Sequence, residues 1–240
     1  MTRLRLATAN IAHGRGRRGR VDLRRTAQLL ARLDADVLCL QEVDRHWSAR
    51  SAWADQAAEL ATGLAMTVVY GPAVRAAPLA PGDPPREYGN AVLSRSPILA
   101  HRVVGLPVPP RAEPRCLLLA QIEGGLTVGC VHLQHNSAAA RTRQAAAVAE
   151  EVAGADPLVL AGDFNAEPGQ PELAALTARL TDGWTAAGSG GGRTFPARLP
   201  MRRLDQILVS SGVRVSRSAV VRTDASDHRP VVVDLEIGAG

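Results

Sequence analysis

The sequence has no lysine, few aromatic residues and no long apolar run. Each of these shortages disfavours a class of function. All 28 basic residues are arginine, a bias typical of a GC-rich coding sequence, so the net charge of +5 is weak evidence for a nucleic-acid partner. Aromatic residues make up 3% of the chain, which disfavours a protein that binds single strands by base stacking. No uninterrupted apolar run reaches the ~18 residues of a membrane helix, so we expect a soluble protein without stable membrane insertion.

Cysteine is also scarce. The three cysteines are Cys39, Cys116 and Cys130. An odd number without CxxC spacing argues against a disulfide framework and against a cysteine zinc site. The runs 115–123 and 126–132 predict a hairpin in which Cys130 faces Leu119 rather than Cys116, so we expect three buried, reduced thiols. The N-terminus lacks the apolar stretch and cleavage site of a signal peptide, so the expected location is the cytoplasm.

Apolar periodicity predicts strands that alternate with amphipathic helices. Helices are expected at about 22–33, 53–62, 137–152 and 171–180. Strands are expected to end at Asn10 and to cover 36–41, 66–70, 90–94, 115–123, 126–132, 157–161, 203–209, 213–222 and 230–237. The proline-rich segment 76–86 and the glycine-rich segment 187–193 are expected to be surface loops. No repeat or composition shift divides residues 1–240, which predicts a single α/β domain and a monomer.

Polar residues recur directly after the apolar strands, where α/β proteins place their chemistry. They are Asn10, Gln41, Glu42, His132, Asp163, Asn165, Asp205, Asp227 and His228. Oxygen ligands of this kind suit a hard cation such as Mg²⁺. Taken singly, each has a structural alternative: Glu42 as a solvated residue, Asp163 as a turn residue, Asp227 as a cap. A zinc pair of His132 with His135 is disfavoured, because residues three apart on a strand face opposite sides.

Seven sequence blocks in order resemble the endonuclease/exonuclease/phosphatase family of metal-dependent phosphoesterases. The blocks are Asn10 in the first strand, Gln41-Glu42, 88–94, 131–133, 162–165, 203–210 and 226–230. The resemblance covers nearly the whole chain and implies a four-layer α/β sandwich, with two mixed β-sheets packed face to face and helices outside. The alternative, a parallel-sheet dinucleotide-binding fold, lacks a GxGxxG after the first strand.

The resemblance also implies roles for particular residues. Glu42 would be the main metal-ligating carboxylate, with Asn10 and Asp227 in or near the shell of Mg²⁺, for which Mn²⁺ is a substitute. Asp163 would orient and deprotonate the attacking water, held by Asn165. His228, paired with Asp205, and His132 would contact the phosphate from two sides.

Three further positions resemble the family pattern less specifically, and a fourth departs from it. Asn90, Arg115 and Arg141 would contact the substrate, the alternative for both arginines being a solvated surface residue. Gln206 departs from the pattern, because family members often have tyrosine beside the residue that corresponds to Asp205.

The family includes nucleases, sphingomyelinases and inositol-phosphate phosphatases, so the substrate stays open. Arginines in the loop after the first strand favour a phosphodiesterase that acts on nucleic acid; they are Arg15, Arg17, Arg18 and Arg20. The alternative is a phosphatase or phosphodiesterase of a small molecule or lipid head group, with segment 76–86 as a lid. A non-catalytic phosphate-binding module is disfavoured, since the predicted site keeps its carboxylates.

Overall fold

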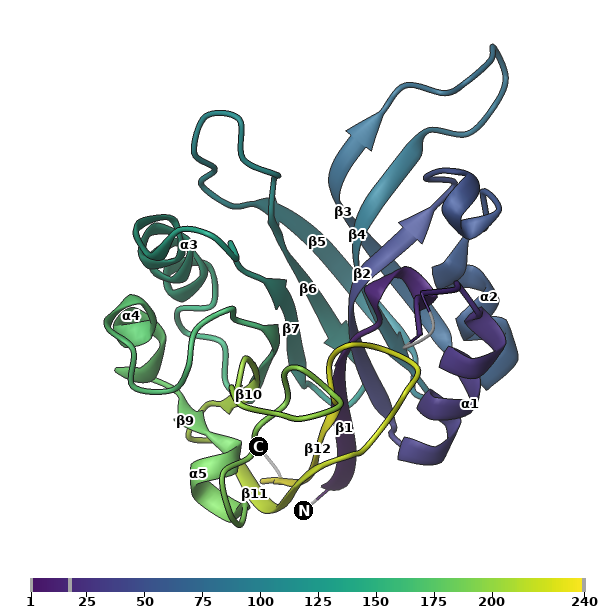
Figure 1. The fold of residues 1–240 in the computed structure, drawn as a ribbon. Helices are drawn as coiled ribbons and strands as arrows, with labels where there is room; N and C mark the ends of the chain where they lie inside the picture. Colours follow the sequence, from purple (N-terminus) through teal and green to yellow (C-terminus); the bar gives the residue numbers. More distant parts are fainter. Residues whose placement is uncertain (1, 17–18, 239–240) are drawn as a thin grey trace.

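The computed structural model describes residues 2–16 and 19–238 and has four layers (Figure 1). The first sheet has the strand order β11 (Val213–Val220), β12 (Val231–Ile237), β1 (Thr2–Asn10), β2 (Val37–Arg45), β4 (Arg86–Ser94), β3 (Thr67–Ala76). The second has the order β5 (Ile98–Gly105), β6 (Cys116–Ile122), β7 (Thr127–His132), β8 (Leu158–Asp163), β10 (Asp205–Val209), β9 (Thr181–Asp182). The helices are α1 (Leu23–Leu33), α2 (Gln56–Leu64), α3 (Ala138–Glu151), α4 (Ala174–Thr177) and α5 (Gly183–Ala187).

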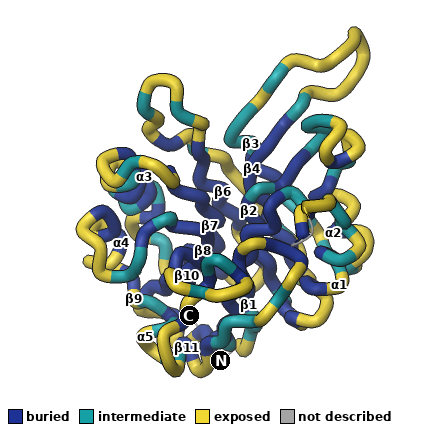
Figure 2. The backbone as a smooth tube through the Cα atoms, in the orientation of Figure 1, coloured by how far each residue is buried: buried dark blue, intermediate teal, exposed yellow. Residues whose placement is uncertain are grey.

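The core lies between the sheets, and two further apolar layers lie under the helices (Figure 2). The inner layer includes Leu6, Cys39, Val92, Leu118, Val128, Ile207 and Val233. Leu29, Leu30 and Leu33 of α1 pack on the outer face of the first sheet, and α3 packs on the second through Ala145 and Val148. Burial of each leucine side chain stabilises the fold by about 1.5–3 kcal/mol. The predicted α/β sandwich is confirmed.

Each sheet contains one pair of parallel strands joined by a helix: β1–α1–β2 in the first sheet and β7–α3–β8 in the second. All other neighbouring strands are antiparallel. Parallel strands end at the same edge of a sheet, and side chains there are placed by rigid backbone. The crossovers therefore bring the ends of four strands to one edge of the sandwich.

The hairpin of β6 and β7 differs from the prediction by one residue. Cys130 pairs with Leu118, not with the predicted Leu119. The Ile122 N–H donates to the Leu126 carbonyl and closes a three-residue loop, whereas the predicted register assumed a two-residue turn. The conclusion for sulfur is unchanged: the three cysteines are free and buried, and burial raises the pKa of the Cys116 thiol to about 12.

Some predicted boundaries were wrong for local reasons. The helix expected from residue 53 begins at Gln56, because the Asp55 carboxylate accepts from the Ala58 N–H and caps it. The helix expected over 171–180 is a 3₁₀ turn followed by α4. Strand β5 was missed because most of its residues are exposed and show no apolar alternation.

Segment 77–85 projects from the body as an exposed loop (Figure 1), as expected. None of the described helices is long and apolar enough to cross a membrane.

Candidate active site

Strand register brings the predicted site residues together at one edge of the sandwich. Asn10, the last residue of β1, pairs with Gln41 of β2. His132, the last residue of β7, pairs with Asp163, the last residue of β8. Asp163 also pairs with Asp205, which begins β10 from the same edge. Residues far apart in the sequence thus become neighbours because their strands end together.

Asp163 is the centre of the cluster. Its Oδ2 lies 3.1 Å from Nδ2 of Asn10, 3.6 Å from Nε2 of His132 and 3.7 Å from Nε2 of His228. Its Oδ1 accepts from the Asn165 backbone N–H at 2.9 Å, whereas the Asn165 side chain donates to the Leu133 carbonyl at 3.0 Å. Burial raises the pKa of Asp163 to about 6, against the opposing charge of His228. The carboxyl group can therefore exchange a proton near neutral pH.

His228 is buried and paired with Asp205, as predicted. Nδ1 of His228 lies 2.8 Å from Oδ2 of Asp205, which leaves Nε2 facing Asp163. Burial by itself lowers the pKa of His228, but the carboxylates of Asp205 and Asp163 outweigh it and raise that pKa to about 10. The ring of Phe195 packs against the imidazole with centroids 4.7 Å apart. The ring is therefore cationic and fixed in orientation.

His132 contacts Asp163 from the opposite side, and its tautomer follows from Arg115. Nη1 of Arg115 lies 3.5 Å from Nδ1 of His132. A guanidinium only donates, so Nδ1 accepts and the proton sits on Nε2, toward Asp163. Burial and the charge of Arg115 lower the pKa of His132 well below its usual value. The site thus holds one cationic and one neutral imidazole, both with an N–H on Nε2.

Glu42 lies inside β2, not after the strand end as predicted. A bulge between Leu40 and Val43 leaves Glu42 at φ 57°, a left-handed conformation that turns its side chain to the site. Its Oε1 accepts from Nδ2 of Asn10 at 3.0 Å, and its Oε2 lies 4.0 Å from Nδ1 of His13. Burial raises the pKa of Tyr88, and the Glu42 carboxylate beside it adds to that shift.

The predicted metal ligands occupy different positions. Asn10 spans the Glu42 and Asp163 carboxylates with its amide nitrogen, while its oxygen accepts from the Ala12 N–H at 3.0 Å. Asp227 is exposed on the rim of the site. A set that was not predicted as metal-binding, Asp163, Asp205 and His228, has one ligand atom from each residue within 4.8 Å of the others.

The charge of the cluster fits a divalent cation. It contains four carboxylates: Glu42, Asp163, Asp205 and Asp227. Within residues 2–16 and 19–238, no arginine forms an ion pair with any of them. The histidines offset only part of this negative charge, and oxygen donors of this kind suit Mg²⁺ or Mn²⁺.

The three predicted substrate contacts differ in their surroundings. Arg115 is buried against His132, and its Nη1 pairs with Glu113 at 2.6 Å. The Asn90 amide nitrogen donates to the Cys116 carbonyl at 3.1 Å, so this side chain joins the two sheets. The hydrogen bonds of Arg141 go to Glu172 and to the 134–135 backbone, and none goes to a predicted site residue.

The sequence did not single out His13, although it lies three residues after Asn10 and faces Glu42. Burial and the charge of Arg50 lower the pKa of His13. No spacing signal marked it, because its approach depends on a tight turn after β1. Of the predicted arginine loop, Arg15 and Arg20 are exposed, and Arg17 and Arg18 lie outside the described residues.

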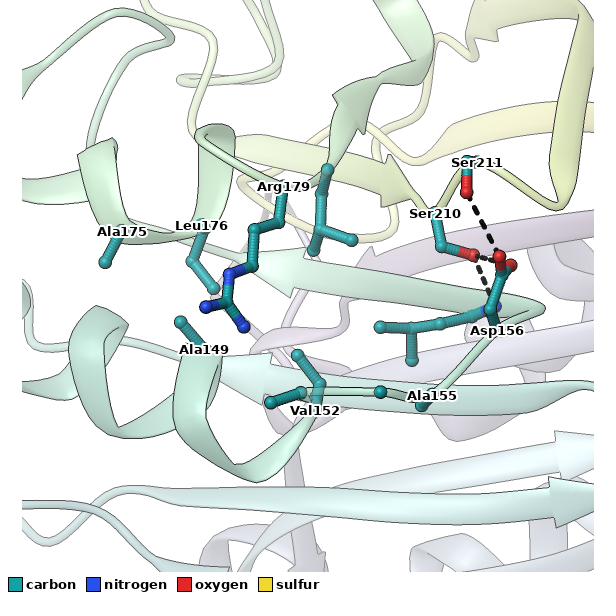
Figure 3. Close-up of a pocket in the computed structure, with 13 residues that line it drawn as sticks. Ala149, Val152, Ala155, Asp156, Ala175, Leu176, Arg179, Ser210 and Ser211 are labelled. Carbon is teal, nitrogen blue, oxygen red and sulfur yellow. Dashed lines mark hydrogen bonds between the residues drawn. The ribbon is translucent and has the colours of Figure 1, made fainter.

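A cavity of about 210 Å³ lies elsewhere, between α3, α4 and the β10–β11 turn (Figure 3). Arg179 reaches across it, and Asp156 binds the hydroxyls of Ser210 and Ser211 at its other end. Its lining contains none of the predicted site residues. The cavity is therefore separate from the cluster.

The geometry agrees with comparisons to known proteins. The model of the endonuclease/exonuclease/phosphatase family matches residues 7–228. The chain belongs to this family. It is a phosphoester hydrolase, because members of the family are phosphoester hydrolases that depend on a metal ion.

Similar proteins differ in what is known of them. An Escherichia coli protein, the uncharacterized YbhP, is 33% identical over 224 residues, which covers 85% of each chain. A family member from Beutenbergia cavernae has a TM-score of 0.85 and 28% identity over 99% of this chain and 72% of its own. Bt3783, a mannosyl-6-phosphatase from Bacteroides thetaiotaomicron, shares the fold with a TM-score of 0.78 and 20% identity, over 98% of this chain and 100% of its own.

Proposed function

We propose that the protein is a divalent-metal-dependent phosphodiesterase that cleaves a nucleic acid strand. The observation that carries this proposal is the convergence of Asn10, His132 and His228 on Oδ2 of Asp163, at 3.1, 3.6 and 3.7 Å. Oδ2 of Asp163 is thus an acceptor with three N–H donors beside it, and the two imidazole contacts are longer than a hydrogen bond. That arrangement suits a water attacking phosphorus beside two phosphate oxygens.

The proposed reaction assigns Asp163 as the general base. Its Oδ2 accepts the proton of the attacking water while Asn10 and the Asn165 backbone N–H fix the carboxylate. The cationic His228 donates from Nε2 to one phosphate oxygen, and Asp205 holds its tautomer. His132 donates from Nε2 on the other side. As the water oxygen bonds to phosphorus, the bond from phosphorus to the leaving oxygen breaks, and that oxygen takes a proton from solvent. The donors stabilise the negative charge that grows on the phosphate oxygens in the transition state.

Glu42 and Asp227 would hold the divalent cation, Mg²⁺ or Mn²⁺, through their carboxylate oxygens. When bound, the ion supplies positive charge to the phosphate and the leaving oxygen. Asn10 then acts as a positioning residue, because its amide spans Glu42 and Asp163 and keeps the two carboxylates in fixed relation.

A groove lined by arginine supports a polyanionic substrate. It measures about 610 Å³, includes Asp227 in its lining and contains Arg32, Arg198, Arg222 and Arg229. Among the described residues none of these four arginines forms an ion pair. Their charges are available for phosphates beyond the one that is cleaved, which favours a strand over a single phosphomonoester.

The test combines a substrate panel with two sets of variants. Supercoiled DNA, single-stranded RNA, bis-p-nitrophenyl phosphate and mannose 6-phosphate are incubated with Mg²⁺ or Mn²⁺, with Asp163→Asn as the blank. We expect metal-dependent strand cleavage that the blank lacks. In Arg198→Gln/Arg222→Gln we expect the ratio of strand cleavage to bis-p-nitrophenyl phosphate hydrolysis to fall about tenfold, with a shallower salt dependence. The matched control is Arg143→Gln/Arg179→Gln, which changes two arginines outside the groove.

The second candidate is a phosphatase of a small molecule, which the fold-level likeness to a mannosyl-6-phosphatase favours. Segment 77–85, an exposed loop between β3 and β4, would then act as a lid. Intact nucleic acid together with turnover of mannose 6-phosphate would replace the first candidate by this one.

We further propose a single catalytic domain that acts as a monomer in the cytoplasm, where the three free thiols stay reduced.

A further inference from the structure

His13 lies in a strained turn that the surrounding structure holds from several sides. Ala12 and His13 both adopt the left-handed region, at φ 46° and 47°. The Ala12 N–H donates to the side chain of Asn10 at 3.0 Å, and Nε2 of Gln56 donates to the His13 carbonyl at 2.8 Å. Gln56 in turn accepts from the Asp44 N–H of β2. Two consecutive non-glycine residues in this region persist only where neighbouring contacts fix them, and such strain gathers at functional sites.

The turn aims the imidazole at Glu42. Nδ1 of His13 is buried, has no hydrogen-bond partner among the described residues and lies 4.0 Å from Oε2 of Glu42. A buried polar atom without a partner is rare in a folded protein and needs a ligand or water to satisfy it. Glu42 is itself turned toward this point by the bulge in β2, at φ 57°. Two separate backbone distortions therefore direct these two side chains toward one point.

We propose that Nδ1 of His13 and Oε2 of Glu42 are two ligands of one divalent transition-metal ion, so that the protein prefers Mn²⁺ to Mg²⁺. This inference rests on the proposed function, in which Glu42 holds the cation. With ligand bonds of about 2.1 Å, neighbouring ligands of an octahedral ion lie about 3 Å apart and opposite ligands about 4.2 Å apart. The observed 4.0 Å therefore requires the two atoms to lie nearly opposite each other, or to approach by about 1 Å when the ion binds. Mg²⁺ binds oxygen almost exclusively. Mn²⁺ also favours oxygen but, as a first-row transition ion, accepts an imidazole nitrogen more readily than Mg²⁺, and the later first-row ions bind it more tightly.

A purely structural role for His13 explains less. Glycine satisfies a left-handed turn position at lower cost, so the turn alone does not call for an imidazole. A water molecule that bridges Nδ1 and the Glu42 carboxylate would satisfy both atoms and is the competing explanation. It differs from the proposal in a measurable way, because a bridging water gives the imidazole no direct bond to a metal.

The experiment measures metal binding by the purified full-length protein, without any substrate. Calorimetry gives the Kd of Mn²⁺ and of Mg²⁺ for the wild type, His13→Asn, Glu42→Gln and the control His101→Asn. Asparagine tolerates positive φ, and His101 is an exposed histidine on β5. Electron spin-echo envelope modulation of bound Mn²⁺ reports directly bonded nitrogen. If His13→Asn does not fold, His13→Gly replaces it, since glycine adopts this φ without strain.

We expect tighter binding of Mn²⁺ than of Mg²⁺ by the wild type, with nitrogen modulation. In His13→Asn we expect the modulation to weaken and the Kd for Mn²⁺ to rise about tenfold or more, while the Kd for Mg²⁺ changes less than about threefold. His101→Asn should match the wild type. An unchanged Mn²⁺ Kd and modulation in His13→Asn would overturn the inference. If Glu42→Gln still weakens both metals, the proposed function survives; if it weakens neither, the assignment of Glu42 fails as well.

Discussion

Oδ2 of Asp205 lies 2.8 Å from Nδ1 of His228, and this contact joins the two sheets at the site. Asp205 begins β10 of the second sheet, whereas His228 lies just before β12 of the first. The pair therefore exists only when the sheets are packed in register. The imidazole it holds faces Asp163 with its second nitrogen, so an inter-sheet contact also sets the charge of the site.

Replacing Asp205 by asparagine should lower the pKa of His228 while the size of the side chain beside it is kept. The amide keeps the size of the side chain but removes the negative charge that raises the pKa of His228 to about 10. We expect that pKa to fall toward the usual 6.5 and kcat at neutral pH to fall by about 10²-fold. An NMR titration of the His228 ring, together with steady-state rates, checks both. A His228 pKa that stays near 10 would contradict the assignment.

Asp163→Asn should abolish hydrolysis and yet stabilise the metal-free protein above mildly acidic pH. Burial raises the pKa of Asp163 from 3.8 to about 6, so the folded state binds this proton more tightly than the unfolded state. The protonated carboxyl favours folding below the unfolded value, and this contribution is lost as pH rises through about 6. At about pH 7.5 the neutral amide avoids a loss of roughly 1–3 kcal/mol.

Calorimetric melting in the presence of a chelator, at about pH 4 and about pH 7.5, measures this difference. The Tm of Asp163→Asn should exceed that of the wild type at the higher pH and approach it at the lower. Asp83→Asn, in the exposed loop between β3 and β4, controls for the general effect of losing a negative charge. Equal Tm differences at both pH values would show that the Asp163 carboxyl does not titrate in this range.

Gly162, the residue before Asp163, leaves space for the neighbouring strand. A Cβ at this position would lie 1.9 Å from the carbonyl oxygen of Val131. In Gly162→Ala the strands β7 and β8 must separate, which we expect to cost about 3 kcal/mol and to displace Asp163 from His132. The free energy of unfolding, measured with denaturant, and the hydrolysis rate should both fall. Gly63→Ala in α2, where an added Cβ meets nothing within 4 Å, is the matched control and should keep the activity without any loss of stability, because alanine favours a helix over glycine.

Asp156 stabilises the β10–β11 turn far from the site (Figure 3). Its carboxylate accepts from Ser210 at 2.6 Å, Ser211 at 3.1 Å and the Gly212 N–H at 2.9 Å, and these bonds lower its pKa. Because the folded pKa lies below 3.8, the stabilisation is complete above that value and is lost as pH falls through the folded pKa. We expect Asp156→Asn to cost about 0.5–1 kcal/mol at neutral pH, since the group is exposed.

The pH profile of that loss is the test. The difference in unfolding free energy between wild type and Asp156→Asn should shrink toward zero as the pH falls from 3.8 through the folded pKa, and hydrolysis should remain at the wild-type rate. A constant difference across the acid range would mean that the carboxylate charge makes no contribution. A loss of hydrolysis would show that this turn is coupled to the site.

Much of the fold was predictable because its signals are local. Strands buried on both faces, such as β8, appear in the sequence as short apolar runs, and α3 follows its N-cap Ser137. The edge strand β5 and the one-turn helix α4 carry no such signal, since their stability comes from neighbours. The predicted register of the β6–β7 hairpin was wrong by one residue, because the loop length depends on which backbone groups pair across Gly124-Gly125.

The candidate site, like the fold, has features that the sequence predicts and features that it does not. The sequence alone determined that polar residues follow the strands, because the residue types at the ends of apolar runs are visible without any structure. It could not determine that Glu42 sits on a bulge, that Arg115 sets the tautomer of His132, or that His13 points at Glu42. Those facts depend on backbone turns and on contacts between side chains far apart in the chain. Only the tertiary structure decides them, because strand pairing and loop contacts within each sheet fix the distances between groups that local sequence leaves independent.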